Sequence, residues 1–315
     1  MKTRWLALTL LSTLAQGSLH AAEELSAASS FAFPSVQEGA GARALSLGST
    51  YVGIAEGSSS LFWNPAGLGA LQALEVALHH TAGLVGATQE IAVFGLPLGH
   101  SNGLGVSLSY EDNGAFDAYD ANGNAAGTFA AKAYGASIGW GVRCPSAVSF
   151  GLTLKGNRQD IAGTVANSVA GDIGLKWEPN PDLSLGAAYT NLGPAVDGQQ
   201  LAQGLRVGGS AYAGKCTNMQ LLFAVSGEAL THGDNSLHFG LEGTLHQFLA
   251  LRAGYAFAVP AVDTAGIPGW TLGAGVIADK LSLDYAVVPK GDLGNMQRIS
   301  LTYGFGEPCK SPSTL

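Results

Sequence analysis

The feature that most constrains the fold is an apolar residue at every second position, repeated from about residue 73 towards the C-terminus. A period of two indicates strands with one apolar face, whereas a helix would repeat every 3.6 residues. The alternation is clearest in the stretches 104–110, 148–154, 237–241 and 299–305. The chain is therefore predicted to be all-β over most of its length.

Turn-forming residues divide this region into fourteen predicted strands. An even number of antiparallel strands is typical of a closed barrel in a bacterial outer membrane. The prediction is thus a 14-stranded antiparallel transmembrane β-barrel over residues 73–306. The predicted strands are 73–82, 87–98, 102–111, 127–142, 146–157, 165–177, 182–190, 202–214, 217–230, 236–246, 248–258, 269–279, 281–289 and 295–306.

The predicted connections differ in length between the two ends of the barrel. One end has short ones, such as 98–101 and 143–146, and the other has longer ones, such as 111–127 and 158–164. Short periplasmic turns and longer outer loops are typical of outer-membrane barrels. All three cysteines, Cys144, Cys216 and Cys309, then fall on the periplasmic side. A disulfide between two of them is compatible with that compartment, but the sequence does not identify the pair.

Charge separates a membrane barrel from the alternative, a secreted soluble β-protein. Charged residues make up 12% of the chain, against about 25% in soluble domains. The non-apolar face consists mainly of Gly, Ala and Ser, whereas a solvated face would carry more charge. We therefore expect apolar side chains to face lipid and small or ionic ones to face the lumen. The predicted lumen charges are Lys132, Lys155, Asp172, Lys176, Arg206, Glu228, Glu242, Arg252, Asp284 and Arg298.

The N-terminal residues predict export. Lys2 and Arg4 precede the apolar stretch 5–14, and small residues follow up to Ala22. This order is that of a secretory signal peptide, residues 1–21, with cleavage near Ala21; the alternative is a buried N-terminal helix. No run of eighteen apolar residues follows, so no transmembrane helix is expected. Removal of Lys2 and Arg4 leaves 13 basic against 23 acidic residues, which argues against a nucleic-acid partner.

Patterns of enzymes and cofactor sites are weak. GASIG at 135–139 fits G-x-S-x-G, but it lies inside a predicted strand rather than at a strand–turn–helix junction. DANGN at 120–124 suggests a calcium loop but lacks the glycine and the final glutamate of such a loop. There is no C-x-x-C motif for zinc or redox chemistry. We therefore expect no enzyme activity, no metal and no cofactor.

Two stretches resemble a known family. GARALSLGSTYVGIAEGSSSLFWNPAGLGAL at 41–71 resembles the N-terminal motif of the PorV/PorQ family of outer-membrane proteins, which is related to the FadL-type channels. LSLDYAVVPKGDLGNMQRISLTYGF at 281–305 resembles the last hairpin of that family. The chain departs from barrels that end on an aromatic residue, because a tail, residues 307–315, follows the predicted barrel.

The resemblance implies that residues 22–72 form a hatch inside the barrel lumen. Without it, Asn64-Pro65 would be interpreted as an ordinary helix cap in a surface loop. Within the hatch, Phe62 and Trp63 would fill the lumen, and Arg43 would need an acidic partner there. Phe62, Trp63, Asn64 and Pro65 are expected to gate the hatch and Arg43 to anchor it, with Gly67 as a further hatch residue.

Two functions are compatible with this resemblance. The first is passive transport of hydrophobic small molecules, similar to long-chain fatty acids, across the outer membrane of a Gram-negative bacterium. The alternative is a PorV-like carrier or scaffold of a type IX protein secretion system, in which outer loops such as 111–127 would hold a secreted protein. The expected surroundings are outer-membrane lipid in both cases.

Overall fold

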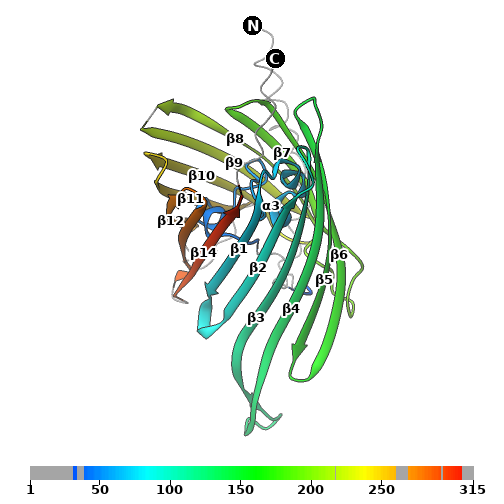
Figure 1. Ribbon diagram of the computed structural model, residues 1–315. Coiled ribbons are helices and arrows are strands. Elements are labelled where there is room, and N and C mark those ends of the chain that lie inside the picture. The colour runs from blue at the N-terminus through cyan, green and yellow to red at the C-terminus, as the bar shows by residue number, and fades with distance from the viewer. Residues whose placement is uncertain (1–30, 34–38, 217, 260–268, 292–293, 307–315) are drawn as a thin grey trace. The chain divides into compact units, whose positions relative to one another are not determined.

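The computed structural model describes residues 31–33, 39–216, 218–259, 269–291 and 294–306. The predicted signal peptide, residues 22–30 and 34–38 of the predicted hatch, and the tail 307–315 lie outside them. Short helices precede the first strand, one further helical turn lies between the first two strands, and the described residues form fourteen strands; Figure 1 shows their arrangement. The helical elements are α2 (Ala42–Ser46), α3 (Ser60–Trp63), η2 (Pro65–Ala70) and η3 (Leu84–Gly86). The first seven strands are β1 (Leu74–Ala82), β2 (Thr88–Pro97), β3 (Asn102–Tyr119), β4 (Ala125–Arg143), β5 (Val148–Ile161), β6 (Thr164–Asn180) and β7 (Leu183–Leu192). The others are β8 (Gly204–Cys216), β9 (Met219–Leu230), β10 (Asn235–Leu245), β11 (Leu249–Val259), β12 (Trp270–Ala278), β13 (Leu281–Pro289) and β14 (Asn295–Phe305).

The helices of the described residues are all short. None of them has the length and apolar composition that a membrane-crossing helix requires.

The strands form a closed antiparallel barrel, as the sequence predicts. Each strand pairs with its neighbours in the chain, and β1 pairs with β14 from Leu74 opposite Phe305 to Ala82 opposite Gln297. Closure matters because it leaves no strand edge with unpaired backbone groups along the paired length. The predicted number of strands and their antiparallel order are confirmed.

The alternation in the sequence separates the two faces of the wall. In β5, Phe150, Leu152 and Leu154 are exposed on the outer face, whereas Thr153 and Lys155 are buried on the inner one. A strand directs successive side chains to opposite faces, so one apolar stripe per strand produces an apolar exterior around the whole barrel. This outer face is the one expected to contact lipid.

Two connections predicted as long loops are instead continuations of strands. β3 extends to Tyr119 and β4 begins at Ala125, so most of 111–127 is paired, and 158–164 shrinks to a turn at Ala162 and Gly163. In Figure 1, β3 and β4 continue well beyond β1 and β2. The sequence misses this extension because polar residues and glycines interrupt the period of two there, while backbone pairing continues. We call the end with these turns the hairpin end.

The turn of the β3–β4 hairpin explains the sequence that suggested calcium. The Asp120 carboxylate accepts hydrogen bonds from the backbone N–H groups of Asn122 and Asn124, at 2.9 and 2.8 Å. Asp is common in turns because its side chain bonds the backbone in this way. The Asn124 side-chain amide, together with these N–H groups, lowers the pKa of the Asp120 carboxyl. The 120–124 motif is therefore a turn in which the Asp120 side chain bonds the backbone of the turn itself.

Residues 39–72, which we call the N-terminal segment, contact the inner face of strands all round the barrel. The Ala42 N–H donates to Ser300 Oγ of β14 at 2.8 Å, and Ser184 Oγ of β7 donates to the Gly53 carbonyl at 2.6 Å. The Gly48 N–H donates to Thr271 of β12 at 3.0 Å. The first of these bonds satisfies an N–H at the start of α2, and the other two join irregular backbone of the segment to the wall.

Glycines on the inner face allow this close packing. A Cβ on Gly151 of β5 would overlap the backbone of Pro65, one on Gly186 of β7 would overlap Val52, and one on Gly254 of β11 would overlap Gly48. Only glycine permits two backbones to approach so closely. Packing against the N-terminal segment therefore accounts for part of the glycine excess, 45 of 315 residues.

Candidate functional site

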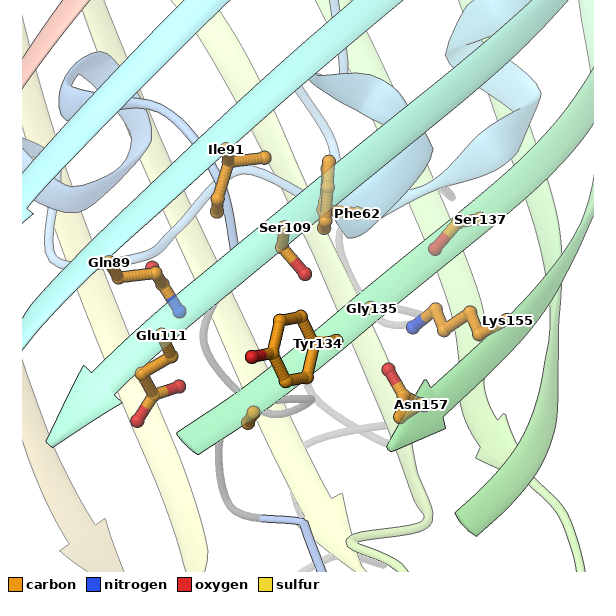
Figure 2. Close-up of a pocket in the computed structure, with 11 residues that line it drawn as sticks. Phe62, Gln89, Ile91, Ser109, Glu111, Tyr134, Gly135, Ser137, Lys155 and Asn157 are labelled. Carbon is orange, nitrogen blue, oxygen red and sulfur yellow. The ribbon is translucent and has the colours of Figure 1, made fainter. Parts of the chain in front are cut away.

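A cavity lies beside helix α3, on the inner side of β2 to β5 (Figure 2). The space between its lining residues is about 480 Å³, a figure that includes the part open to solvent. The N-terminal segment packs on Gly103 of β3 and Gly151 of β5. The cavity lies nearer the hairpin end, because its residues Ser109 and Asn157 lie farther along the same two strands. The lining residues are Phe62, Gln89, Ile91, Ser109, Glu111, Ala133, Tyr134, Gly135, Ser137, Lys155 and Asn157.

The cavity exists because the inner face of β4 carries very small side chains. Ala133, Gly135 and Ser137 occupy successive inward positions, and a Cβ at Gly135 would already collide with Ser109 Oγ. The neighbouring Tyr134 belongs to the outward face, where it is 46% exposed, and it borders the cavity beside Gly135. The wall is therefore thin at this point.

Helix α3 presents its two aromatic residues in different directions. Phe62 is half-buried and lines the cavity. Trp63 is buried instead, and its Nε1–H donates to the Ala40 carbonyl at 2.8 Å. Its ring lies edge-on to Tyr51 at 6.1 Å between centroids, with the Arg206 guanidinium 5.5 Å from the ring. Of the two aromatics expected to fill the interior, only Phe62 borders open space.

Asn64, Pro65 and Gly67 hold the N-terminal segment together. Asn64 is fully buried, and its Nδ2 donates to the carbonyls of Val52 and of Leu175 in β6 at 3.0 and 2.9 Å. Its Oδ1 accepts from the Ala66 N–H at 3.2 Å, with Pro65 at the first position of η2. The pair is thus a helix cap, as the simpler interpretation of the sequence has it, but a buried one that also contacts the wall. At Gly67 a Cβ would overlap the Ala55 carbonyl.

Arg43 has the acidic partner that the sequence argument required. Its Nε and Nη2 each donate at 2.8 Å to Glu242 of β10, and its Nη1 donates to Glu56 at 2.9 Å. Glu242 also accepts from Arg252 Nε at 2.5 Å, and Arg252 Nη1 donates to Asp284 of β13 at 2.6 Å. The N-terminal segment is therefore tied to three strands by one connected ionic network.

Nine of the ten predicted lumen charges lie on the inner face. Lys155 pairs with Asp172 at 2.7 Å, and Arg206 pairs with Glu228 at 2.8 Å. Arg298 donates to Thr81 at 2.7 Å and also to the Gly39 carbonyl. The nine are Lys155, Asp172, Lys176, Arg206, Glu228, Glu242, Arg252, Asp284 and Arg298.

Lys132 is the exception, and its prediction as a lumen charge is wrong. It shares an outward register with Tyr134 and Ile138, which are exposed, and it lies directly opposite Asp112 of β3. From the sequence, a charge within a predicted strand is expected to face inward. At Lys132, however, the strand has passed the aromatic pair Tyr110 and Tyr134, beyond which the outer face becomes polar.

The cysteines leave the disulfide question open. Cys144 carries a free thiol. The side chain of Cys216 and the whole of Cys309 lie outside the described residues.

Several cavity residues were not identified from the sequence, among them Ser109, Glu111, Ser137 and Asn157. Their inward position follows from the period of two once the register is known. The sequence does not show how far along the barrel axis the N-terminal segment packs against the wall. This position decides which inward side chains meet open space.

Comparison with solved structures gives the fold a context. A TodX monoaromatic hydrocarbon channel carrying the deltaS2S3 mutation has a TM-score of 0.60 and 14% identity, over 85% of this chain and 99% of the other. The CymD monoaromatic hydrocarbon channel has a TM-score of 0.60 and 12% identity, over 85% and 98%. A FadL homologue of Pseudomonas aeruginosa has a TM-score of 0.50 and 14% identity, over 84% and 97%.

The chain has the fold of these channels. At such identities the likeness concerns the fold alone. No family model matches the sequence, and no curated protein sequence matches it. The predicted relation to FadL-type channels agrees with these structures, whereas the predicted resemblance to the PorV/PorQ family is not confirmed.

Proposed function

We propose that the protein is an outer-membrane channel through which hydrophobic small molecules pass passively, with the N-terminal segment as its hatch inside the lumen. The observation that carries the proposal is the cavity beside Phe62, at the junction of this segment and the inner face of β2 to β5. The apolar outer face and the likeness of the fold to hydrocarbon channels and to a FadL homologue support it.

In this proposal the residues of the N-terminal segment divide into a gate and its anchors. Phe62 gates, because its ring borders the open space that a ligand would occupy. Arg43, Trp63, Asn64, Pro65 and Gly67 anchor, because each is held in buried contacts within the segment or with the wall. Apolar burial, at about 25 cal/mol per Å², would drive capture of the ligand, and passage requires that binding remain weak enough for release.

The proposed location is the outer membrane of a Gram-negative bacterium, reached through the predicted signal peptide. The test is to fractionate cells that produce the protein and to compare the gel migration of heated and unheated membrane samples. We expect outer-membrane recovery, a heat-dependent shift, and faster uptake of hydrophobic compounds than in vector cells. Recovery in the soluble periplasmic fraction, or a folded barrel without added uptake, would refute the channel.

A second candidate is the secretion carrier of the sequence analysis. The feature that favours it is the long β3–β4 hairpin, where Phe116 and Phe129 stack at 5.5 Å between ring centroids on cross-strand partners. A variant whose hairpin is shortened by removing 115–130 in favour of a two-residue turn separates the two. Loss of exported proteins with unchanged uptake favours the carrier, and the reverse favours the channel.

A further inference from the structure

Among the residues that the structure describes, the cavity beside Phe62 offers no unpaired positive charge to a ligand. Lys155 is its only lining residue that is basic, and its Nζ lies 2.7 Å from Asp172 Oδ2 and 2.9 Å from Asn191 Oδ1. Both members of this ion pair are buried. The acidic lining residue, Glu111, would repel an entering carboxylate. A carboxylate entering here would lose its hydration without gaining a cation, which is strongly unfavourable.

The cavity does offer neutral hydrogen-bonding groups. Ser109 of β3 and Ser137 of β4 are half-buried in the lining, and Figure 2 shows their hydroxyl groups on either side of Gly135. Among the described residues neither hydroxyl has a hydrogen-bond partner, and neither is among the residues with further interactions. A serine hydroxyl both donates and accepts, so it suits a ligand hydroxyl or carbonyl equally.

The third element of the lining is apolar. Phe62 and Ile91 face the same space as the two hydroxyls. An aromatic ring gains both apolar burial and a stacked or edge-on contact with another aromatic ring. The lining therefore combines an apolar side with neutral polar groups and one carboxylate, Glu111.

We propose that this cavity prefers uncharged compounds that combine an apolar body with one hydroxyl or carbonyl group, such as phenols. Hydrocarbons leave the serine hydroxyls unused, and carboxylates meet no free cation. The inference rests on the proposed channel function and narrows its ligand class away from the fatty-acid-like compounds that the resemblance suggests. One neutral hydrogen bond corresponds to a preference of about two- to tenfold.

The test uses three compounds with the same methylphenyl body: toluene, p-cresol and p-toluate. Initial uptake of each labelled compound is measured in cells that produce the protein and in vector cells, with the folded amount set by heat-dependent gel migration. We expect p-cresol to show the largest excess over vector, toluene a smaller one and p-toluate none. Faster uptake of p-toluate than of p-cresol would overturn the inference.

Two sets of variants assign the preference to residues. The double variant S109A/S137A should reduce the p-cresol excess to the toluene level. Ser107→Ala, a buried position on the same strand that does not line the cavity, should leave it unchanged. Retention of the p-cresol preference in the double variant would refute the role of the hydroxyls.

Variants of Lys155 and Asp172 test the exclusion of carboxylates. Asp172→Asn keeps an acceptor for the Asn191 N–H but removes the partner charge of Lys155, so p-toluate uptake should appear. K155M/D172N removes both charges and should behave like the parent protein. A folded D172N protein that still excludes p-toluate would contradict the inference. If none of the three compounds exceeds vector in the folded parent protein, the channel proposal itself fails.

Discussion

The inner face of the barrel contains two regions that share the same strand alternation but differ in what their inward side chains do. At Gly151, Gly186 and Gly254 the inward positions of the wall carry no side chain, and the backbone of the N-terminal segment packs directly on them. Around Ser109 and Ser137 the wall has small polar side chains, and open space remains. We call these the packed region and the open region.

The contrast shows how one barrel can hold a fixed segment and still keep a cavity. Removal of the Cβ atom at inward positions brings two backbones together, which favours packing at the density of a protein core. Retention of short polar side chains where no segment arrives leaves a space with hydrogen-bonding groups. The choice between Gly and Ser at inward positions therefore sets the local character of the interior. Substitutions in the packed region should affect stability, and those in the open region should affect uptake.

The largest loss of stability is expected for Glu242→Gln in the packed region. Glu242 is the shared partner of Arg43 and Arg252, so its neutralisation leaves the buried Arg252 and the partly buried Arg43 with less compensation. Breaking a buried ion pair costs about 3–5 kcal/mol. Thermal unfolding of the purified barrel, followed by gel migration after heating to increasing temperatures, measures the effect.

The matched control for this variant is Glu90→Gln. Glu90 bonds His80 at 2.5 Å on the outer face, and its side chain is 54% exposed. Glu90 lies opposite Tyr110, at the edge of the apolar band rather than within it. Exposed pairs there contribute little, so the midpoint should hardly move. Equal shifts for the two variants would show that the ionic network does not anchor the segment.

The next effect compares two neighbours on α3. Leu61 is fully buried in a core cluster with Leu68 and Val93, whereas Phe62 lines the cavity. Leu61→Ala should lower the free energy of unfolding by about 2–5 kcal/mol and leave uptake per folded barrel unchanged. Phe62→Ala should cost less stability and raise uptake of hydrophobic compounds, because it removes the ring proposed to gate. A larger uptake change in the Leu61 variant would mean that the two regions are not functionally distinct.

Much of this architecture follows from the sequence. The period of two predicts all fourteen strands, and it places inward charges such as Asp172 and Arg298 correctly because their strands are apolar on the opposite face. It fails at Lys132 and in the β3–β4 extension. There the strands leave the apolar band, so alternation no longer distinguishes inside from outside while backbone pairing continues.

The candidate site was only partly predictable, for a different reason. Phe62 and Arg43 stand out because an aromatic residue and a charge in a segment that folds against the wall need partners. Ser109 and Ser137 resemble every other small inward residue. Their role depends on where the N-terminal segment ends inside the wall, which is a tertiary property that no local pattern encodes.

A smaller effect tests the glycine contacts. Gly151→Ala places a methyl group against the Pro65 backbone and should cost about 1–3 kcal/mol. Gly156→Ala, on the outer face of the same strand with no atom near its missing Cβ, should be neutral or slightly stabilising. The comparison uses the same unfolding midpoint. Equal midpoints would mean that the segment shifts away from β5 without cost, and the packed region would lose its physical basis.

The smallest effect is expected at Lys132, and it tests where the interior ends. Lys132 and Asp112 face each other on the outer side of the β3–β4 pair, beyond the aromatic residues. Charges outside the interior contribute about 0–1 kcal/mol even when they are paired, so Lys132→Gln should leave both the unfolding midpoint and uptake within error. An inward Lys132 would be buried like Lys155, and its neutralisation would then lower the midpoint as strongly as Glu242→Gln does. A shift of that size would mean that the register of β4 differs by one residue. Ser137 would then face lipid, and the open region on which the comparison depends would not exist.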